Sequence, residues 1–247
     1  AAMKFVWPKR VTIWWLSFLQ NFCGVLFLFS GFVKAVDPLG TAFKLEQYFA
    51  EFDSVFSGAG MDRLASVFPA LSTYAVGLSV FMIVFEMVLG LMLLIGAHRG
   101  LTAWLFFLLV AFFTVLTGFT YLTGYVPAGV NFFEYSKWGE FVETNMKVTD
   151  CGCFGDFIKL KPKTSFLKDV FLLIPALIFL FMFRRKHQLF TAPVRNAVIV
   201  VSALLLLLYN INNFAWNEPH LDFRPFKVGV DVAKQKELEY EAQNNVE

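Results

Sequence analysis

Five long apolar stretches constrain the fold of this chain more than any other feature. They run roughly over residues 11–33, 71–95, 101–121, 166–183 and 194–214. Crossing a bilayer takes about 20 residues of helix, and inside lipid the backbone groups must find their partners within the segment. Charged residues make up only 16% of the chain, against roughly 25% in soluble domains. The sequence therefore predicts an all-α membrane protein with five transmembrane helices.

Basic residues indicate how these spans are oriented. They gather before the first stretch (Lys4, Lys9, Arg10), between the second and third (His98, Arg99), and between the fourth and fifth (Arg184, Arg185, Lys186, His187, Arg195). Five spans place all three segments on one side. The positive-inside rule then predicts a multi-pass protein of the bacterial inner membrane, with a cytoplasmic N-terminus and a periplasmic C-terminus. The net charge of +2 and the absence of a basic block give no indication of nucleic-acid binding.

Two long loops are expected on the exported side. In the first, residues 34–70, apolar side chains recur at helical spacing (Leu45, Tyr48, Phe49, Phe52, Phe56). This pattern predicts an amphipathic helix that lies on the membrane surface or on the bundle. The second loop, residues 122–165, is aromatic in its first half, which suits a membrane interface.

Cys151 and Cys153 lie in this second loop, separated by one glycine in "TDCGCFGDF". On the exported side thiols are readily oxidised. A disulfide between them would close a small ring that needs a bent backbone, which the intervening glycine permits. Strained, exposed disulfides are the easily exchanged ones. One interpretation is therefore thiol–disulfide exchange with a partner protein.

Two other interpretations of the cysteine loop stay open. A metal site would have to recruit Asp150 or Asp156, since His220 is the only histidine expected on this side, and that set matches zinc spacing poorly. In the remaining interpretation, the motif is a glycine-containing turn whose two thiols have no chemical function. The third cysteine, Cys23, falls inside the first span, where a lone cysteine is usually a packing residue.

Glu86 is an ionisable residue in the middle of the second span, which makes it a candidate functional residue. Lys34, at the outer end of the first span, is a candidate partner if it reaches inward. Alternatively, Glu86 is neutral and bonds the backbone, Thr114 or Thr117, and Lys34 extends to the surface beside Asp37. We expect Lys34, Asp37 and Glu86 to frame a polar pocket, and a quinone is the one cofactor considered for it.

Three segments together resemble the MauE/DoxX group of redox-associated bacterial membrane proteins, in the longer type of the Bacteroidota. They are "GVLFLFSGFVKAVDPLGTAFKLEQY", "FEMVLGLMLLIG" and "DCGCFGDFIKLKP". The resemblance implies a DoxX-like four-helix membrane core over residues 1–185, a fifth transmembrane helix over 186–216 and an exported polar tail over 217–247.

The resemblance also implies a redox-associated function. The first hypothesis is a thiol–disulfide accessory in which Cys151, Cys153 and Glu86 act on an exported thioredoxin-like or client protein, or in a quinone-linked system. The second hypothesis is a non-catalytic docking subunit of a larger cell-envelope complex. Transport is a weaker third, because one mid-membrane glutamate is thin evidence for a pathway and no pair of broken helices is evident.

Overall fold

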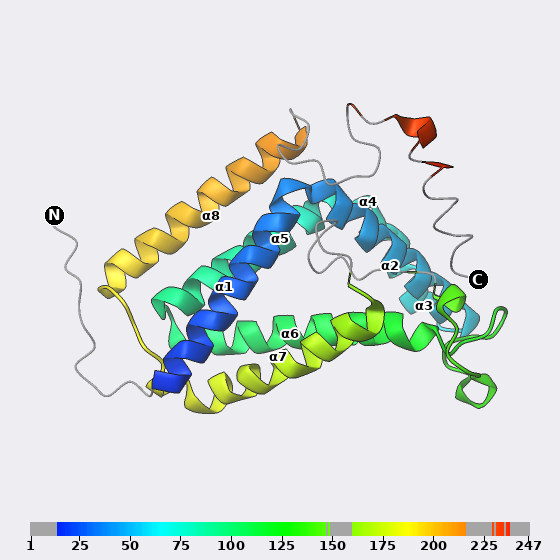
Figure 1. The fold of residues 1–247 in the computed structure, drawn as a ribbon, viewed down its shortest axis with the longest axis horizontal. Helices are drawn as coiled ribbons and strands as arrows, with labels where there is room; N and C mark the ends of the chain where they lie inside the picture. The colour runs from blue at the N-terminus through cyan, green and yellow to red at the C-terminus, as the bar shows by residue number, and fades with distance from the viewer. Residues whose placement is uncertain are drawn as a thin grey trace.

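The computed structural model describes residues 14–146, 148, 160–215, 229, 231–234 and 236–237 (Figure 1). It contains five long helices: α1 (Trp14–Val36), α5 (Ala75–Ile95), α6 (Arg99–Thr123), α7 (Pro162–Met182) and α8 (Ala192–Ala215). All five are long and apolar enough to cross a membrane, which confirms the predicted number of spans. The largest differences are at the start of α5, at residue 75 rather than 71, and at the start of α7, at residue 162 rather than 166.

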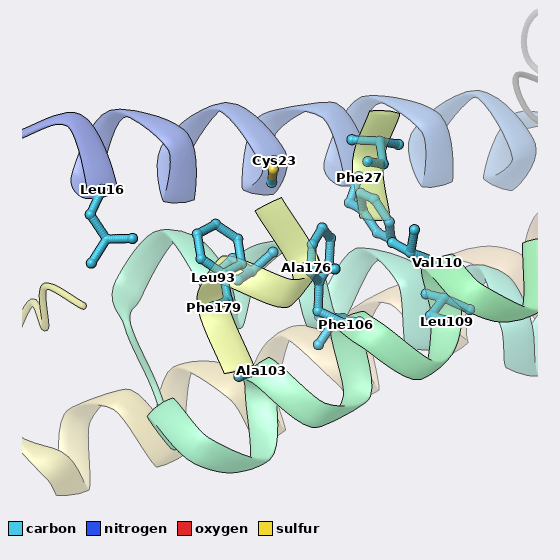
Figure 2. Close-up of a cluster of buried hydrophobic side chains, with 12 residues drawn as sticks. Leu16, Cys23, Phe27, Leu93, Ala103, Phe106, Leu109, Val110, Ala176 and Phe179 are labelled. Atoms are coloured by element: carbon cyan, nitrogen blue, oxygen red, sulfur yellow. The ribbon is translucent and has the colours of Figure 1, made fainter. Parts of the chain in front are cut away.

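Four of these helices share one core. Residues from α1, α5, α6 and α7 form a continuous cluster of buried apolar side chains (Figure 2). Phe106 on α6 lies at its centre, with ring centroids 4.9 Å from Phe27 and 5.6 Å from Phe179. Cys23 is fully buried in the same cluster as a free cysteine, so its predicted role as a packing residue is confirmed.

Helices α1 and α5 approach each other closely through small residues. A Cβ atom added at Gly24 would lie 2.9 Å from the Gly90 carbonyl oxygen, and one at Gly90 would lie 2.8 Å from the Gly24 oxygen. Backbone contact of this kind is typical of helix pairs in membranes. Gly96 has a different role, because it ends α5 in a left-handed conformation with φ of 66°.

Helix α8 packs on the bundle near both of its ends. Val198 and Ile199 pack against Met92, Ile95 and Ala97. Leu206 and Tyr209 pack against a small cluster on α1 and α5, and the Asn213 side chain donates hydrogen bonds to the Ala35 and Val36 carbonyls at 2.9 and 2.5 Å. Only 6% of the apolar span of α8 is buried inside the protein. The rest of its surface is therefore available to lipid.

The chain between the first two spans folds into three helices, α2 (Pro38–Gly58), α3 (Asp62–Ala65) and α4 (Val67–Thr73). The predicted amphipathic helix is confirmed as α2, and its apolar face packs on the bundle. Phe52 is the central contact, with ring centroids 5.3 Å from Phe68 and 4.8 Å from Phe119 on α6. We call this side of the molecule the loop end. It also carries two single-turn helices, η1 (Tyr135–Lys137) and η2 (Glu143–Asn145).

The opposite side, which we call the basic end, contains the α5–α6 turn and the α7–α8 loop, residues 96–98 and 183–191. Helix α7 runs between the two ends and contains Pro175 in its interior. A proline there has no N–H to donate to the carbonyl four residues earlier.

Candidate functional site

Lys34 and Glu86 form an ion pair inside the bundle. The Lys34 Nζ lies 2.6 Å from the Glu86 Oε2, and the two side chains are 6% and 4% exposed. The predicted partnership is thus confirmed, and the alternative in which Lys34 extends to the surface is wrong. A cation in hydrocarbon needs such a partner. The ring of Phe113, 5.0 Å from the ammonium, adds a cation–π contact.

Glu86 takes neither of the hydroxyl partners considered for it. The Thr114 hydroxyl donates to the Val110 carbonyl at 2.7 Å, and the Thr117 hydroxyl donates to an Asp169 carboxylate oxygen at 3.0 Å. The interpretation of Glu86 as a group bonded to these threonines is therefore wrong.

Asp169 belongs to a second buried pair that the sequence reading missed. Its Oδ1 contacts the Nζ of Lys168, and its side chain is 3% exposed. The two residues lie two turns inside α7, because that helix begins at Pro162, where proline occupies the first turn. The earlier start places both charges about two turns inside the helix rather than in the first turn of the predicted span.

The two pairs line one small cavity between α1, α5, α6 and α7. Its volume is about 20 Å³, and its walls include Ser30, Phe113 and Leu172 as well as the four charged residues. One water molecule needs roughly this much space and two to four polar partners. The arrangement thus offers a water-sized, electrically balanced site with two carboxylates and two ammonium groups.

This cavity does not fit a quinone. A quinone ring is several times larger than a single water molecule, and the cavity has room for about one water. Lys34 and Glu86 do frame a polar pocket, but the described residues leave no space for a ring beside them.

Asp37 lies apart from the cavity. It caps the start of α2, where its carboxylate accepts a hydrogen bond from the Gly40 amide at 3.2 Å. Asp37 is also absent from the residues that line the cavity. Its geometry is that of a helix cap, which satisfies an otherwise unpaired amide.

Cys151 and Cys153 lie outside the described residues, but the chain on either side is described. Val148 is 3% exposed and packs with Tyr48 and Leu116. The Tyr48 hydroxyl is 2.8 Å from that of Thr120, one turn above Thr117 on α6. The chain is described again from Leu160, directly before α7. Both stems of the cysteine loop are thus at the loop end, above the helices that carry the second buried pair.

A larger cavity lies at the loop end itself. It has a volume of about 580 Å³ and is formed by α2 and the chain from 123 to 145, with Glu51 and Glu134 among its lining residues. Asn131 joins the two walls by donating to the Val55 carbonyl at 2.8 Å. Hydrogen bonds from Lys137 and from the Asn131 amide lower the pKa of Glu134, so this carboxylate is charged at neutral pH. The volume is typical of a small-ligand pocket.

Comparison with known proteins gives no relative. No family model, no curated protein and no solved structure matches this chain.

Proposed function

We propose that this protein is a membrane-embedded accessory that exchanges thiols and disulfides with an exported protein through Cys151 and Cys153. The single observation that carries the proposal is the burial of Val148 against Tyr48 and Leu116, beside a Cys-Gly-Cys motif. Loops held on a rigid scaffold are common carriers of function. We also propose that the protein is related to the MauE/DoxX group and that it lies in the inner membrane with the loop end facing outward.

Chain length supports this placement. Three residues separate Cys151 from Val148, and each residue spans at most about 3.6 Å. The Cys151 α-carbon therefore stays within about 11 Å of the α-carbon of Val148. An attacking thiol needs access to its partner's sulfur, and an anchored stem keeps the pair at the loop end rather than deep in lipid.

The proposed step is balanced without an added oxidant. A thiolate of the exported protein attacks the Cys151–Cys153 disulfide and forms a mixed disulfide, releasing one cysteine as a thiolate. A second thiolate of the same exported protein attacks the mixed disulfide and leaves with a new disulfide bond. The motif gains two electrons and two protons, and the exported protein loses the same. The reverse direction uses the same bonds.

In this proposal Lys34 and Glu86 hold α1 and α5 together beneath the loop. Asp169 lies nearer to the loop stem, because Thr117, to which it bonds, is next to Leu116 in the sequence. Asp37 fixes the start of α2, which carries Tyr48. In this proposal Lys34, Glu86, Asp169 and Asp37 therefore act as positioning residues.

The test is the redox state of the motif in isolated membranes. Alkylation before and after reductant, read by mass spectrometry, is expected to show Cys151 and Cys153 switching together, while Cys23→Ser changes nothing. A Cys153→Ser variant is expected to trap a mixed disulfide that Cys151→Ser, Cys153→Ser lacks. Thiols that stay reduced under oxidant in intact membranes contradict the proposal.

A specific observation favours a second candidate, a docking subunit of an envelope complex. The 580 Å³ cavity and the aromatic cluster around Phe132 present a preformed surface at the loop end, and aromatic residues are enriched in protein interfaces. Under this alternative, purification in mild detergent yields the same partners with Cys151→Ser, Cys153→Ser as with the native chain. Replacement of Phe132 by Ala then removes them.

A further inference from the structure

The α7–α8 loop is bound tightly to the α5–α6 turn at the basic end. The Leu189 amide donates to the Ile95 carbonyl at 2.9 Å, and the His187 Nε2 lies 2.8 Å from the Leu94 carbonyl. Gly96 permits this contact, because a Cβ atom there would lie 2.0 Å from the His187 oxygen. The position of the neighbouring Lys186 is therefore set by the backbone around it.

Lys186 is buried with an unsatisfied charge. The residue is 1% exposed, and its Nζ has no hydrogen-bond acceptor among the residues that the structure describes. The Nε of Arg99 is buried and equally without an acceptor. Burial first, and the Arg99 charge second, lower the pKa of Lys186 to about 8. The ring of Phe179, 5.3 Å from the ammonium, is its only cation–π contact within the same described part of the chain.

The chain supplies no carboxylate for these cations. Residues 96–99 and 184–195 hold five Lys and Arg and no Asp or Glu, and residues 1–13, which lead into the same end of α1, add three Lys and Arg and again no acid. Buried charges in proteins are normally paired. Because no described residue pairs with the Lys186 Nζ or the Arg99 Nε, we expect their counter-ion to come from outside the described part of the chain.

We propose that the basic end binds the phosphate of an anionic phospholipid, with Lys186 Nζ and Arg99 Nε as donors. The site lies at the ends of three spans, α5, α6 and α7, where the headgroups of a bilayer lie. Basic pockets between transmembrane helices recognise lipid headgroups in this way, and charge-assisted bonds from Arg to phosphate are strong. This inference does not depend on the cysteine loop.

The test compares how well the full-length chain retains a neutral and an anionic phospholipid. Purified protein is placed in nanodiscs of neutral phosphatidylcholine with and without phosphatidylglycerol, and native mass spectrometry counts the lipids that remain after release. We expect preferential retention of phosphatidylglycerol. A Lys186→Gln variant is expected to lower that preference by about tenfold, the scale of one charged hydrogen bond.

Arg185→Gln is the matched control, because it removes the same charge one residue away from an exposed side chain. It is expected to change retention by less than about twofold. Equal losses in the two variants would mean diffuse surface attraction and would overturn the proposal. Lys186→Arg, which keeps the cation, is expected to retain the lipid, and a loss there as large as in Lys186→Gln counts against the site.

A separate arm distinguishes a lipid from a free anion. Millimolar inorganic phosphate is added to the protein in neutral nanodiscs, and thermal unfolding is followed. We expect phosphatidylglycerol to raise the midpoint in the native chain and inorganic phosphate to leave it unchanged. A Lys186-dependent rise with inorganic phosphate that equals the lipid effect would assign the site to a free anion and overturn the lipid proposal.

Discussion

The middle of the bundle and its basic end differ in how their buried lysines are paired. In the middle, the chain supplies a carboxylate for each lysine of the cavity, and Lys34 and Glu86 are 2.6 Å apart. At the basic end, Lys186 is as deeply buried, and its Nζ has no hydrogen-bond acceptor among the described residues. The difference follows from the surroundings. Hydrocarbon offers no anion, so a charge there must be paired by the protein, whereas a helix end lies beside phosphates.

The largest expected effect comes from breaking the pair in the middle. Glu86→Ala leaves the Lys34 ammonium buried without its carboxylate, and we expect it to lower the free energy of unfolding by about 3–5 kcal/mol. Unfolding in mixed micelles measures this loss. The control is the double variant Lys34→Met, Glu86→Leu, which removes both charges and should recover most of the stability. A single variant as stable as the native chain would show that Lys34 finds another anion.

The next effect tests the second pair of the cavity. Asp169→Asn keeps an acceptor for the Thr117 hydroxyl but removes the carboxylate that Lys168 contacts. We expect a loss of about 1–3 kcal/mol in the free energy of unfolding, smaller than for Glu86 because the Lys168 side chain is 25% exposed. Thr117→Val, which removes only the neutral donor, serves as the control. If Thr117→Val costs more than Asp169→Asn, the hydrogen bond matters more than the charge.

A third prediction concerns pH at the basic end. Lys186 has a pKa of about 8 in the folded protein and about 10.5 when unfolded, so the unfolded chain binds more protons between these values. Stability in neutral lipid should therefore rise as pH increases from about 8 to about 10.5, by roughly 1–3 kcal/mol. Below pH 8 both states are protonated and the slope vanishes.

The other titratable groups around Lys186 do not hide this rise of stability with pH. Burial lowers the pKa of His187, which is therefore neutral above pH 8, and burial together with the Arg195 charge lowers the pKa of Arg99. Lys186→Gln should abolish the rise, and phosphatidylglycerol should flatten it by pairing the ammonium. A rise that persists unchanged in Lys186→Gln would assign it to other groups.

The smallest effect is expected at an exposed pair with similar geometry. Lys137 Nζ lies 2.7 Å from Glu134 Oε1, but the two side chains are 59% and 41% exposed. Lys137→Met should leave unfolding unchanged within error, because water solvates both charges once they separate. A loss comparable to that of Glu86→Ala would mean that distance, rather than burial, decides the strength of these pairs.

Much of this fold could be predicted from the sequence, because lipid imposes a simple rule on length and polarity. The five spans, the amphipathic helix of the first loop and the Lys34–Glu86 pair all follow from apolar runs interrupted by single charges. Orientation across the membrane and the redox function stay predictions. Cys151 and Cys153 lie outside the described residues, so their role rests on the sequence and on the stem at Val148.

The environment of Lys168 and Asp169 and the burial of Lys186 were missed for different reasons. Apolarity places the start of α7 at Phe166, which puts Lys168 and Asp169 in its first turn, yet the helix starts at Pro162 and both residues lie about two turns inside it. The signal was present in "KPKTS", where a proline at the first turn marks a helix start. The lone Lys186 could not be found in this way, because a basic loop in the sequence indicates topology and does not show which of its cations is buried.

Helix α7 connects the two regions, and Pro175 interrupts it between them. The missing amide leaves the Phe171 carbonyl without its usual partner four residues on, so this is the turn at which α7 bends most easily. A bend at this turn would move the half of α7 that carries Asp169 relative to the half that leads to Lys186.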